Sequence, residues 1–278
     1  MIGSPIGSRW RQRLKPVVRP AMLSFFNLFG PLSSSPSPVP ILLYHSLDES
    51  GSDLSVSPGE FRQQMDWLER RRYRVYTLAE YADALTGVGL KTPAVVITFD
   101  DGYANFLTEA QPILDRYGFR ATIFVQTGYL GRTSGEFSLL DLPLLGRGDL
   151  AALAAGGYEI ASHTVTHPCL TRLERSRARA EIADSRRILE EIIGCPVVSF
   201  AYPRGAYNRE IVELVRAAGY LAAVTIRPGN RGRPEDIFTL PRVTLRPRDG
   251  RAYFRLVLGP FFERYHALFQ LPIPVEGN

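Results

Sequence analysis

The sequence predicts an α/β protein, a distorted or incomplete (β/α) barrel of about seven strands. Short apolar runs alternate with amphipathic helical stretches throughout residues 40–271, which is typical of a parallel sheet with crossover helices. Roughly seven or eight such runs in one domain favour a barrel over a smaller sheet. The alternative is an open, doubly wound sheet. It is weakened because no glycine-rich nucleotide motif follows any of the runs.

Apolar, β-branched runs predict the strands. The clearest is Ala94–Phe99, which reads Ala-Val-Val-Ile-Thr-Phe. The expected strands, in chain order, cover residues 40–45, 73–76, 94–99, 121–125, 158–162, 197–201, 221–226 and 240–245.

Capping residues and helical spacing predict the helices. Ser57 and Thr77 each precede a glutamate by three residues, the pattern of a capping box. Asp149 is expected to cap a later short helix, and Gly259-Pro260 should break the last one. The expected helices cover residues 58–68, 78–85, 105–117, 149–156, 172–193, 208–218 and 251–271.

The net charge of +5 belongs to the N-terminal segment rather than to the barrel. Five of the 33 basic residues and none of the 28 acidic ones lie in residues 1–40, so the rest of the chain carries 28 of each. A neutral body gives no support for nucleic-acid binding. Cys169 and Cys195 are the two cysteines, too few for a disulfide scaffold or a four-sulfur zinc site.

The chain is expected to have three parts. Residues 1–39 form a basic and apolar leader with a Ser/Pro-rich linker, residues 40–271 form the barrel domain, and residues 272–278 form a tail. Residues 9–32 could act as a disordered leader, as a peripheral membrane anchor or as an export signal. Location is therefore membrane-associated or extracytoplasmic if this segment anchors or exports the chain, and cytoplasmic otherwise. No apolar run reaches the eighteen residues of a spanning helix.

Chemically capable side chains follow four of the predicted strands. They are His45, the pair Asp100-Asp101, the pair His163 and His167, and the turn Tyr202–Gly205. Active sites of barrels form where strands end. Taken singly, each group has an ordinary structural explanation, such as a turn. Together, two histidines and a carboxylate make a common catalytic zinc ligand set, and a second carboxylate can act as general base. The combination predicts a metal-dependent hydrolase.

Three segments resemble the signatures of the polysaccharide deacetylase family, also called the NodB homology domain or carbohydrate esterase family 4. They are Thr98–Tyr103 (TFDDGY), Ser162–Pro168 (SHTVTHP) and Phe200–Gly205 (FAYPRG). The opening Leu43-Tyr44-His45 resembles the branch that deacetylates poly-N-acetylglucosamine polymers. The resemblance covers roughly residues 40–250.

This resemblance implies a distorted (β/α) barrel that removes N-acetyl groups from the amino sugars of a polysaccharide or oligosaccharide. It implies a divalent metal as cofactor, zinc (Zn2+) first, with cobalt, nickel or iron as alternatives. The residue roles that it implies are Asp100 as base, Asp101, His163 and His167 as metal ligands, His45 as acid, the Arg204 N–H as oxyanion donor, and Tyr103, Tyr202 and Pro203 as substrate-binding residues.

The sequence departs from the family pattern at two places. Ala201 stands where an arginine usually orients the base, and the late Leu-x-His signature is missing, since the only late histidine, His266, lies in a predicted helix. Arg242, at another strand end, is the candidate for the missing guanidinium.

Three other functions compete with the deacetylase. They are hydrolysis of another C–N bond of the cyclic imide or ureide type, a catalytically silent carbohydrate-binding barrel, and phosphoryl transfer with Mg²⁺. Histidines favour a transition metal over Mg²⁺. The expected partner is an N-acetylated oligo- or polysaccharide, and the long loop 126–148 is expected to help select it.

Overall fold

The computed structural model describes residues 38–269, apart from residues 88, 137, 139 and 248. The predicted leader and its membrane contact through residues 9–32, and the tail at 272–278, lie outside the described residues and stay predictions. None of the helices in the described part of the chain has the length and apolarity that crossing a bilayer requires.

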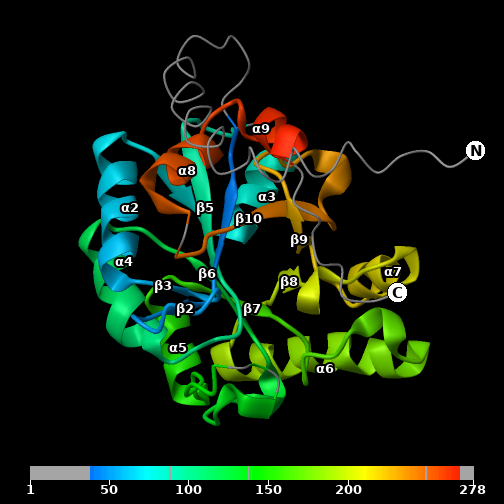
Figure 1. Cartoon of the computed structure of the whole chain (residues 1–278). Coiled ribbons are helices and arrows are strands. Elements are labelled where there is room, and N and C mark those ends of the chain that lie inside the picture. Colours follow the sequence, from blue (N-terminus) through cyan, green and yellow to red (C-terminus); the bar gives the residue numbers. More distant parts are fainter. Residues whose placement is uncertain (1–37, 88, 137, 139, 248, 270–278) are drawn as a thin grey trace, which may run out of the picture.

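Seven parallel strands close into a barrel (Figure 1). The sheet order is β1-β10-β9-β8-β7-β6-β5, and β5 pairs back to β1, so the open-sheet alternative is wrong. The strands are β1 (Ile41–Tyr44), β5 (Ala94–Phe99), β6 (Thr122–Val125), β7 (Glu159–Ser162), β8 (Ser199–Ala201), β9 (Ala222–Pro228) and β10 (Leu240–Thr244). The prediction of about seven barrel strands is confirmed.

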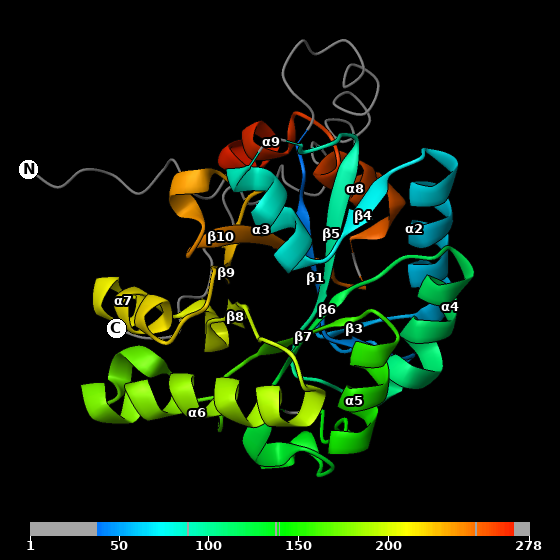
Figure 2. The same ribbon diagram turned by 180° about the vertical axis from the view of Figure 1, so that it is seen from behind.

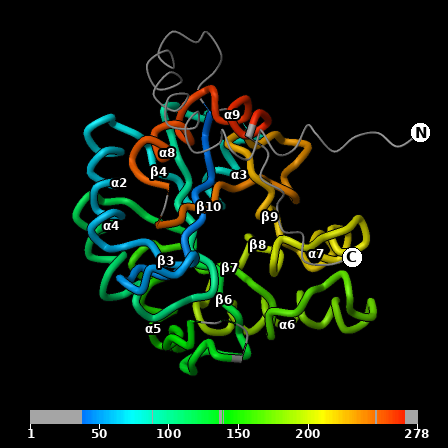
Figure 3. The backbone as a smooth tube through the Cα atoms, viewed as in Figure 1, coloured from blue at the N-terminus to red at the C-terminus, as the bar shows by residue number. Residues whose placement is uncertain are grey.

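The barrel is distorted at two places. β4 (Arg74–Tyr76) pairs with the first half of β5 and β6 pairs with its second half, so β4 and β6 lie along the same edge of β5. The register between β9 and β10 shifts between Leu240 and Arg242. A further pair, β2 (Ser46–Leu47) and β3 (Ser55–Val56), lies in the loop after β1 and was not predicted. Figure 3 shows the first strand, β1, in blue beside β10, although β10 comes much later in the sequence.

Helices surround the barrel, as Figure 2 shows from behind. They are α2 (Pro58–Arg70), α3 (Leu78–Thr86), α4 (Gln111–Arg116), α5 (Arg147–Ala155), α6 (Arg175–Ile193), α7 (Arg209–Ala217), α8 (Gly250–Val257) and α9 (Phe262–Phe269). The expected caps Ser57 and Thr77 accept hydrogen bonds from the backbone of Glu60 and Glu80, and Thr77–Glu80 forms a full capping box. The last helix is divided around Gly259-Pro260, as predicted.

Two helix starts differ from the prediction. Asp149 is not the cap of α5. The cap is Gly146. Asp149 is the third residue of the helix, and its carboxylate accepts a hydrogen bond of 2.8 Å from the Gly146 N–H. The helix expected from residue 105 begins with a π-helical turn, η3 (Phe106–Ala110), before α4. Pro112 explains this irregularity, because it has no N–H to donate to the preceding turn.

Side chains alternate between the inside of the barrel and the helix layer. Ala94 and Val96 of β5 belong to the inner apolar cluster, whereas Val95, Ile97 and Phe99 pack in the outer one. The same period of two continues past the end of the strand, so Asp100 falls on the inner side. This parity places Asp100 in the mouth of the barrel, whereas Asp101 reaches it through a change in backbone direction.

Candidate metal centre and active site

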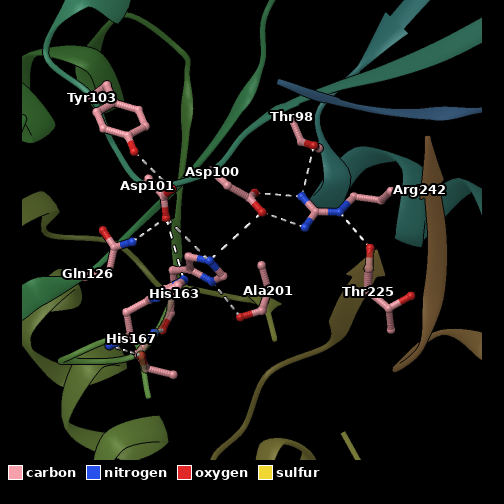
Figure 4. Close-up of polar contacts among 12 residues, drawn as sticks. Thr98, Asp100, Asp101, Tyr103, Gln126, His163, His167, Ala201, Thr225 and Arg242 are labelled. Atoms are coloured by element: carbon pink, nitrogen blue, oxygen red, sulfur yellow. Dashed lines mark hydrogen bonds and ion pairs between the residues drawn. The ribbon is translucent and has the colours of Figure 1, made fainter. Parts of the chain in front are cut away.

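Asp101, His163 and His167 converge at the carboxyl end of the barrel (Figure 4). Asp101 Oδ1 lies 3.8 Å from His163 Nε2 and 3.7 Å from His167 Nε2. Within the described residues, these three form the one group of histidine, cysteine and acidic side chains whose ligand atoms could hold a metal ion, all within 4.8 Å of one another. The structure therefore brings together residues that lie 66 positions apart in the sequence.

The Asp-Asp-Gly turn gives its two carboxylates different directions. Asp100 continues the inner face of β5, whereas Asp101 adopts a left-handed backbone with a φ of 69°. Gly102 follows with a φ of 61°, and a Cβ there would lie 2.7 Å from Val125 Cγ1. A glycine is required at this position both by the backbone angle and by the space.

His163 presents a lone pair to Asp101. Its Nδ1 lies 2.8 Å from the carbonyl oxygen of Ala201, and since a carbonyl only accepts, Nδ1 carries the proton. The unprotonated Nε2 then faces the Asp101 carboxylate. Burial lowers the pKa of His163 to about 4, although the charges of Asp100 and Asp101 act in the opposite direction. The imidazole is neutral at pH 7, the state that a metal ligand requires.

The loop that carries His167 is tied down from helix α6. The Glu181 carboxylate, which is buried, accepts from the N–H groups of Val165 and Thr166 at 2.9 Å each and from the Thr166 hydroxyl at 2.7 Å. Thr164 Oγ1 accepts from the His167 N–H at 2.9 Å. Burial, and after it the charge of Arg204, lowers the pKa of His167 to about 4.

This donor set fits a divalent transition metal. Asp101 Oδ1 and the Nε2 atoms of two neutral imidazoles face one space, and when unprotonated these atoms repel one another unless a cation lies between them. Ligand atoms about 2.0–2.2 Å from a tetrahedral zinc ion would lie roughly 3.3–3.6 Å apart. The separations of 3.7 and 3.8 Å from Asp101 are close to that spacing.

Asp100 is held by Arg242 in a buried, two-pronged ion pair. Arg242 Nη1 and Nη2 donate to Asp100 Oδ1 and Oδ2 at 2.7 Å each, and Nε donates to the Thr225 carbonyl at 2.9 Å. The Arg242 side chain is fully buried. Burial alone would raise the pKa of Asp100, but Arg242, helped by His163 and His45, lowers it to about 2. β10 thus supplies the guanidinium that position 201 lacks.

His45 and Arg204 lie beside this centre. The half-buried His45 directly follows β1, and its charge contributes to lowering the pKa values of both Asp100 and His167. Asn105, which follows the Asp-Asp-Gly turn, holds the segment directly after His45. It donates to Ser46 Oγ at 2.6 Å and to the Leu47 carbonyl at 3.0 Å. Arg204 is exposed, in a short turn after β8, with a left-handed φ of 57°.

The three residues predicted to bind substrate are buried. Tyr103 donates to Ser138 Oγ at 2.8 Å and lies 3.4 Å from Asp101 Oδ2. Tyr202 donates to the Phe238 carbonyl at 2.9 Å and Pro203 is also buried. In these positions their side chains support the loops around the centre, and their contact with substrate stays a prediction. His266 lies on α9 against Phe262.

Sequence reasoning missed Gln126, Glu181 and Asn105. Gln126 Nε2 donates to Asp101 Oδ1 at 2.7 Å, and Gln126 is buried. Its signal was the same as for Asp100: it follows β6 with the inward parity of Phe124. Asn105 and Glu181 carry no comparable signal, because their partners are set by how a loop and a helix pack.

The chain is similar to known polysaccharide deacetylases. The sequence profile of the family described as polysaccharide deacetylase matches residues 88–223. The putative polysaccharide deacetylase YxkH of Bacillus subtilis is 34% identical over 218 residues, which are 77% of this chain and 74% of that protein. The poly-beta-1,6-N-acetyl-D-glucosamine N-deacetylase of Staphylococcus epidermidis is 25% identical over 198 residues, covering 68% of this chain and 67% of that protein.

A solved structure shares the fold. The Streptococcus pyogenes deacetylase PplD, determined in complex with acetate, superimposes with a TM-score of 0.72 at 26% identity. The match covers 81% of this chain and all of that one. Sequence and fold therefore indicate the same family.

Proposed function

Because the chain belongs to the polysaccharide deacetylase family, and is therefore a hydrolase of the carbon–nitrogen bond in N-acetylated amino sugars, we propose that it performs this reaction at the centre around Asp101, His163 and His167. The observation that carries the proposal is the convergence of these three ligand atoms beside the carboxylate of Asp100, which is paired with Arg242 and whose Oδ2 lies 4.0 Å from His163 Nε2. We propose zinc as the resident ion, because two imidazoles and a carboxylate are common zinc ligands.

The metal ion and the side chains would contribute different parts of the reaction. A bound divalent cation lowers the pKa of a water towards neutrality and polarises the acetamide carbonyl. Asp100 is anionic throughout the physiological range, because Arg242 keeps its pKa at about 2, and it accepts the proton that the attacking water loses. Arg242 also fixes both carboxylate oxygens, so that the base keeps one orientation.

The remaining steps fall to the groups around the mouth of the barrel. As the water oxygen bonds to the acetamide carbon, the backbone N–H of Arg204 donates to the oxygen that gains negative charge. His45 delivers a proton to the sugar nitrogen as the C–N bond breaks. Acetate leaves and the free amine remains on the sugar.

A polymer of N-acetylglucosamine is the substrate we propose. The support is the similarity to the Staphylococcus epidermidis enzyme, named for poly-beta-1,6-N-acetyl-D-glucosamine, together with a histidine at the end of β1.

Acetate release tests the proposal. The full chain, stripped of metal and then supplied with zinc, is incubated with N-acetylglucosamine oligomers, and acetate is measured. Release should stop on chelation, return with zinc, and be lost in His167→Ala but kept in His266→Ala, the matched control on α9. Zinc-independent release, or an active His167→Ala variant, would contradict the proposed centre.

A further inference from the structure

Gln126 makes a direct contact with the candidate metal ligand. It follows β6, its side chain is only 1% exposed, and its Nε2 lies 2.7 Å from Asp101 Oδ1 (Figure 4). An ionised carboxylate only accepts hydrogen bonds, so the amide nitrogen must be the atom that faces it. The orientation of the Gln126 amide is therefore fixed by chemistry as well as by packing.

The oxygen that Gln126 binds is the one that faces both imidazoles. Asp101 Oδ1 lies 3.8 Å from His163 Nε2 and 3.7 Å from His167 Nε2. A carboxylate oxygen has two lone pairs, so Oδ1 can accept from the amide and still offer the second pair to a cation. The other oxygen, Oδ2, lies 3.4 Å from the Tyr103 hydroxyl. Contacts on both oxygens limit rotation of the carboxylate.

We propose that Gln126 is a positioning residue that aims Asp101 Oδ1 at the cation and so sets the strength of metal binding. The inference rests on the proposed function, since it assumes that Asp101 is a ligand. Hydrogen bonds from neighbouring groups orient the ligands of metal sites and tune the metal, and losing one typically costs roughly 10–100-fold in affinity.

The neutrality of the glutamine is part of the argument. The charge of Asp100 is already balanced by Arg242 at 2.7 Å. Asp101 then supplies the carboxylate of the candidate ligand group, beside the two imidazoles. A lysine at position 126 would cancel the charge of that carboxylate, whereas an amide donates a hydrogen bond and leaves the charge available to a cation.

Zinc affinity measured without substrate tests the proposal. The probe is Zn²⁺ alone, titrated into the metal-free full chain in competition with a chromophoric chelator. Gln126→Met removes the donor at similar volume, and Gln126→Asn keeps an amide that is too short to reach. The matched control is Gln64→Met, another buried glutamine, which accepts from the Tyr44 hydroxyl at 2.6 Å and takes no part in the metal centre.

The dissociation constant for zinc should rise roughly 10–100-fold in Gln126→Met and Gln126→Asn. Gln64→Met should bind zinc like the unmodified chain, even if its thermal stability falls as much. Unchanged zinc affinity in a folded Gln126 variant would overturn the inference. If the unmodified chain itself does not bind zinc, the proposed metal centre fails. That result is distinguishable from failure of the Gln126 inference alone.

Discussion

Two carboxylates, the buried Asp100 and the half-buried Glu159, stand at opposite ends of the same barrel and differ in their partners. Asp100, at the carboxyl end, lies 2.7 Å from the Arg242 guanidinium, which lowers its pKa to about 2. Glu159, at the amino end of β7, accepts from Thr122 Oγ1 at 2.7 Å and from the Ala79 N–H of helix α3 at 3.0 Å. Burial raises the pKa of Glu159 above its ordinary value.

The comparison shows that burial alone does not create a reactive carboxylate. Glu159 meets neutral donors and serves to join β7 to α3 and β6. Asp100 meets a full positive charge, with histidines nearby. The carboxyl end also holds backbone strain, since Asp101, Thr164, His167 and Arg204 all have positive φ although none is glycine. Such residues cluster at functional sites, where the surrounding structure maintains them.

The largest difference is expected when each of the two carboxylates is replaced by the corresponding amide. Asp100→Asn should lower the rate of acetate release by about 10²–10⁴-fold, because the amide cannot accept the proton of the attacking water. Zinc content, measured by elemental analysis, should persist. Glu159→Gln is the matched control and should keep near-normal turnover. A fully active Asp100→Asn variant would remove Asp100 as the base.

Arg242→Met should produce the largest loss of stability. It leaves the Asp100 charge buried without its partner, and such losses typically cost about 3–5 kcal/mol in the free energy of unfolding. Chemical denaturation of the metal-free chain measures this. The double variant Asp100→Asn with Arg242→Met should recover part of the loss, because the unpaired charge is gone. A loss below about 1 kcal/mol in Arg242→Met would mean that the pair is not buried as described.

The pH dependence of zinc affinity should be unusually flat above about pH 5. Protons compete with zinc only below the pKa of each free histidine, and burial places those of His163 and His167 at about 4. Histidines with ordinary pKa values near 6.5 would lose about tenfold in affinity per histidine for each pH unit below that value. Titrations at pH 7.0, 6.0 and 5.5 distinguish the two cases. A steep loss already at pH 6 would show that the imidazoles are not shielded.

The smallest effect is expected at the amino end of the barrel. Because the pKa of Glu159 is raised in the folded state, its contribution to stability is present at low pH and is lost as pH rises through the folded pKa. Glu159→Gln should therefore gain stability relative to the unmodified chain as pH increases, by about 1 kcal/mol or less. Thermal unfolding between pH 4 and 8 measures it. A strong destabilisation at pH 7 would mean that the charge itself is needed.

The sequence was sufficient for the barrel because its signals are local. Runs such as Ala94–Phe99 predict strands, and the ends of parallel strands must share one rim. The same rule placed Asp101 beside His163. Gln126 follows β6 with the inward parity of Phe124, a signal that sequence reasoning missed. Glu181 carries no such signal, because its hydrogen bonds to groups 15 and 16 residues away depend on how helix α6 packs. Asp149 was misassigned because its carboxylate can cap a helix from either of two positions.

Anomalous diffraction from zinc-loaded crystals tests the central claim most directly, since it locates the ion without reference to activity. The account predicts one strong peak within about 2.0–2.2 Å of Asp101 Oδ1, His163 Nε2 and His167 Nε2. A peak elsewhere, or Asp101 turned away from the ion with Asp100 bound in its place, would contradict it.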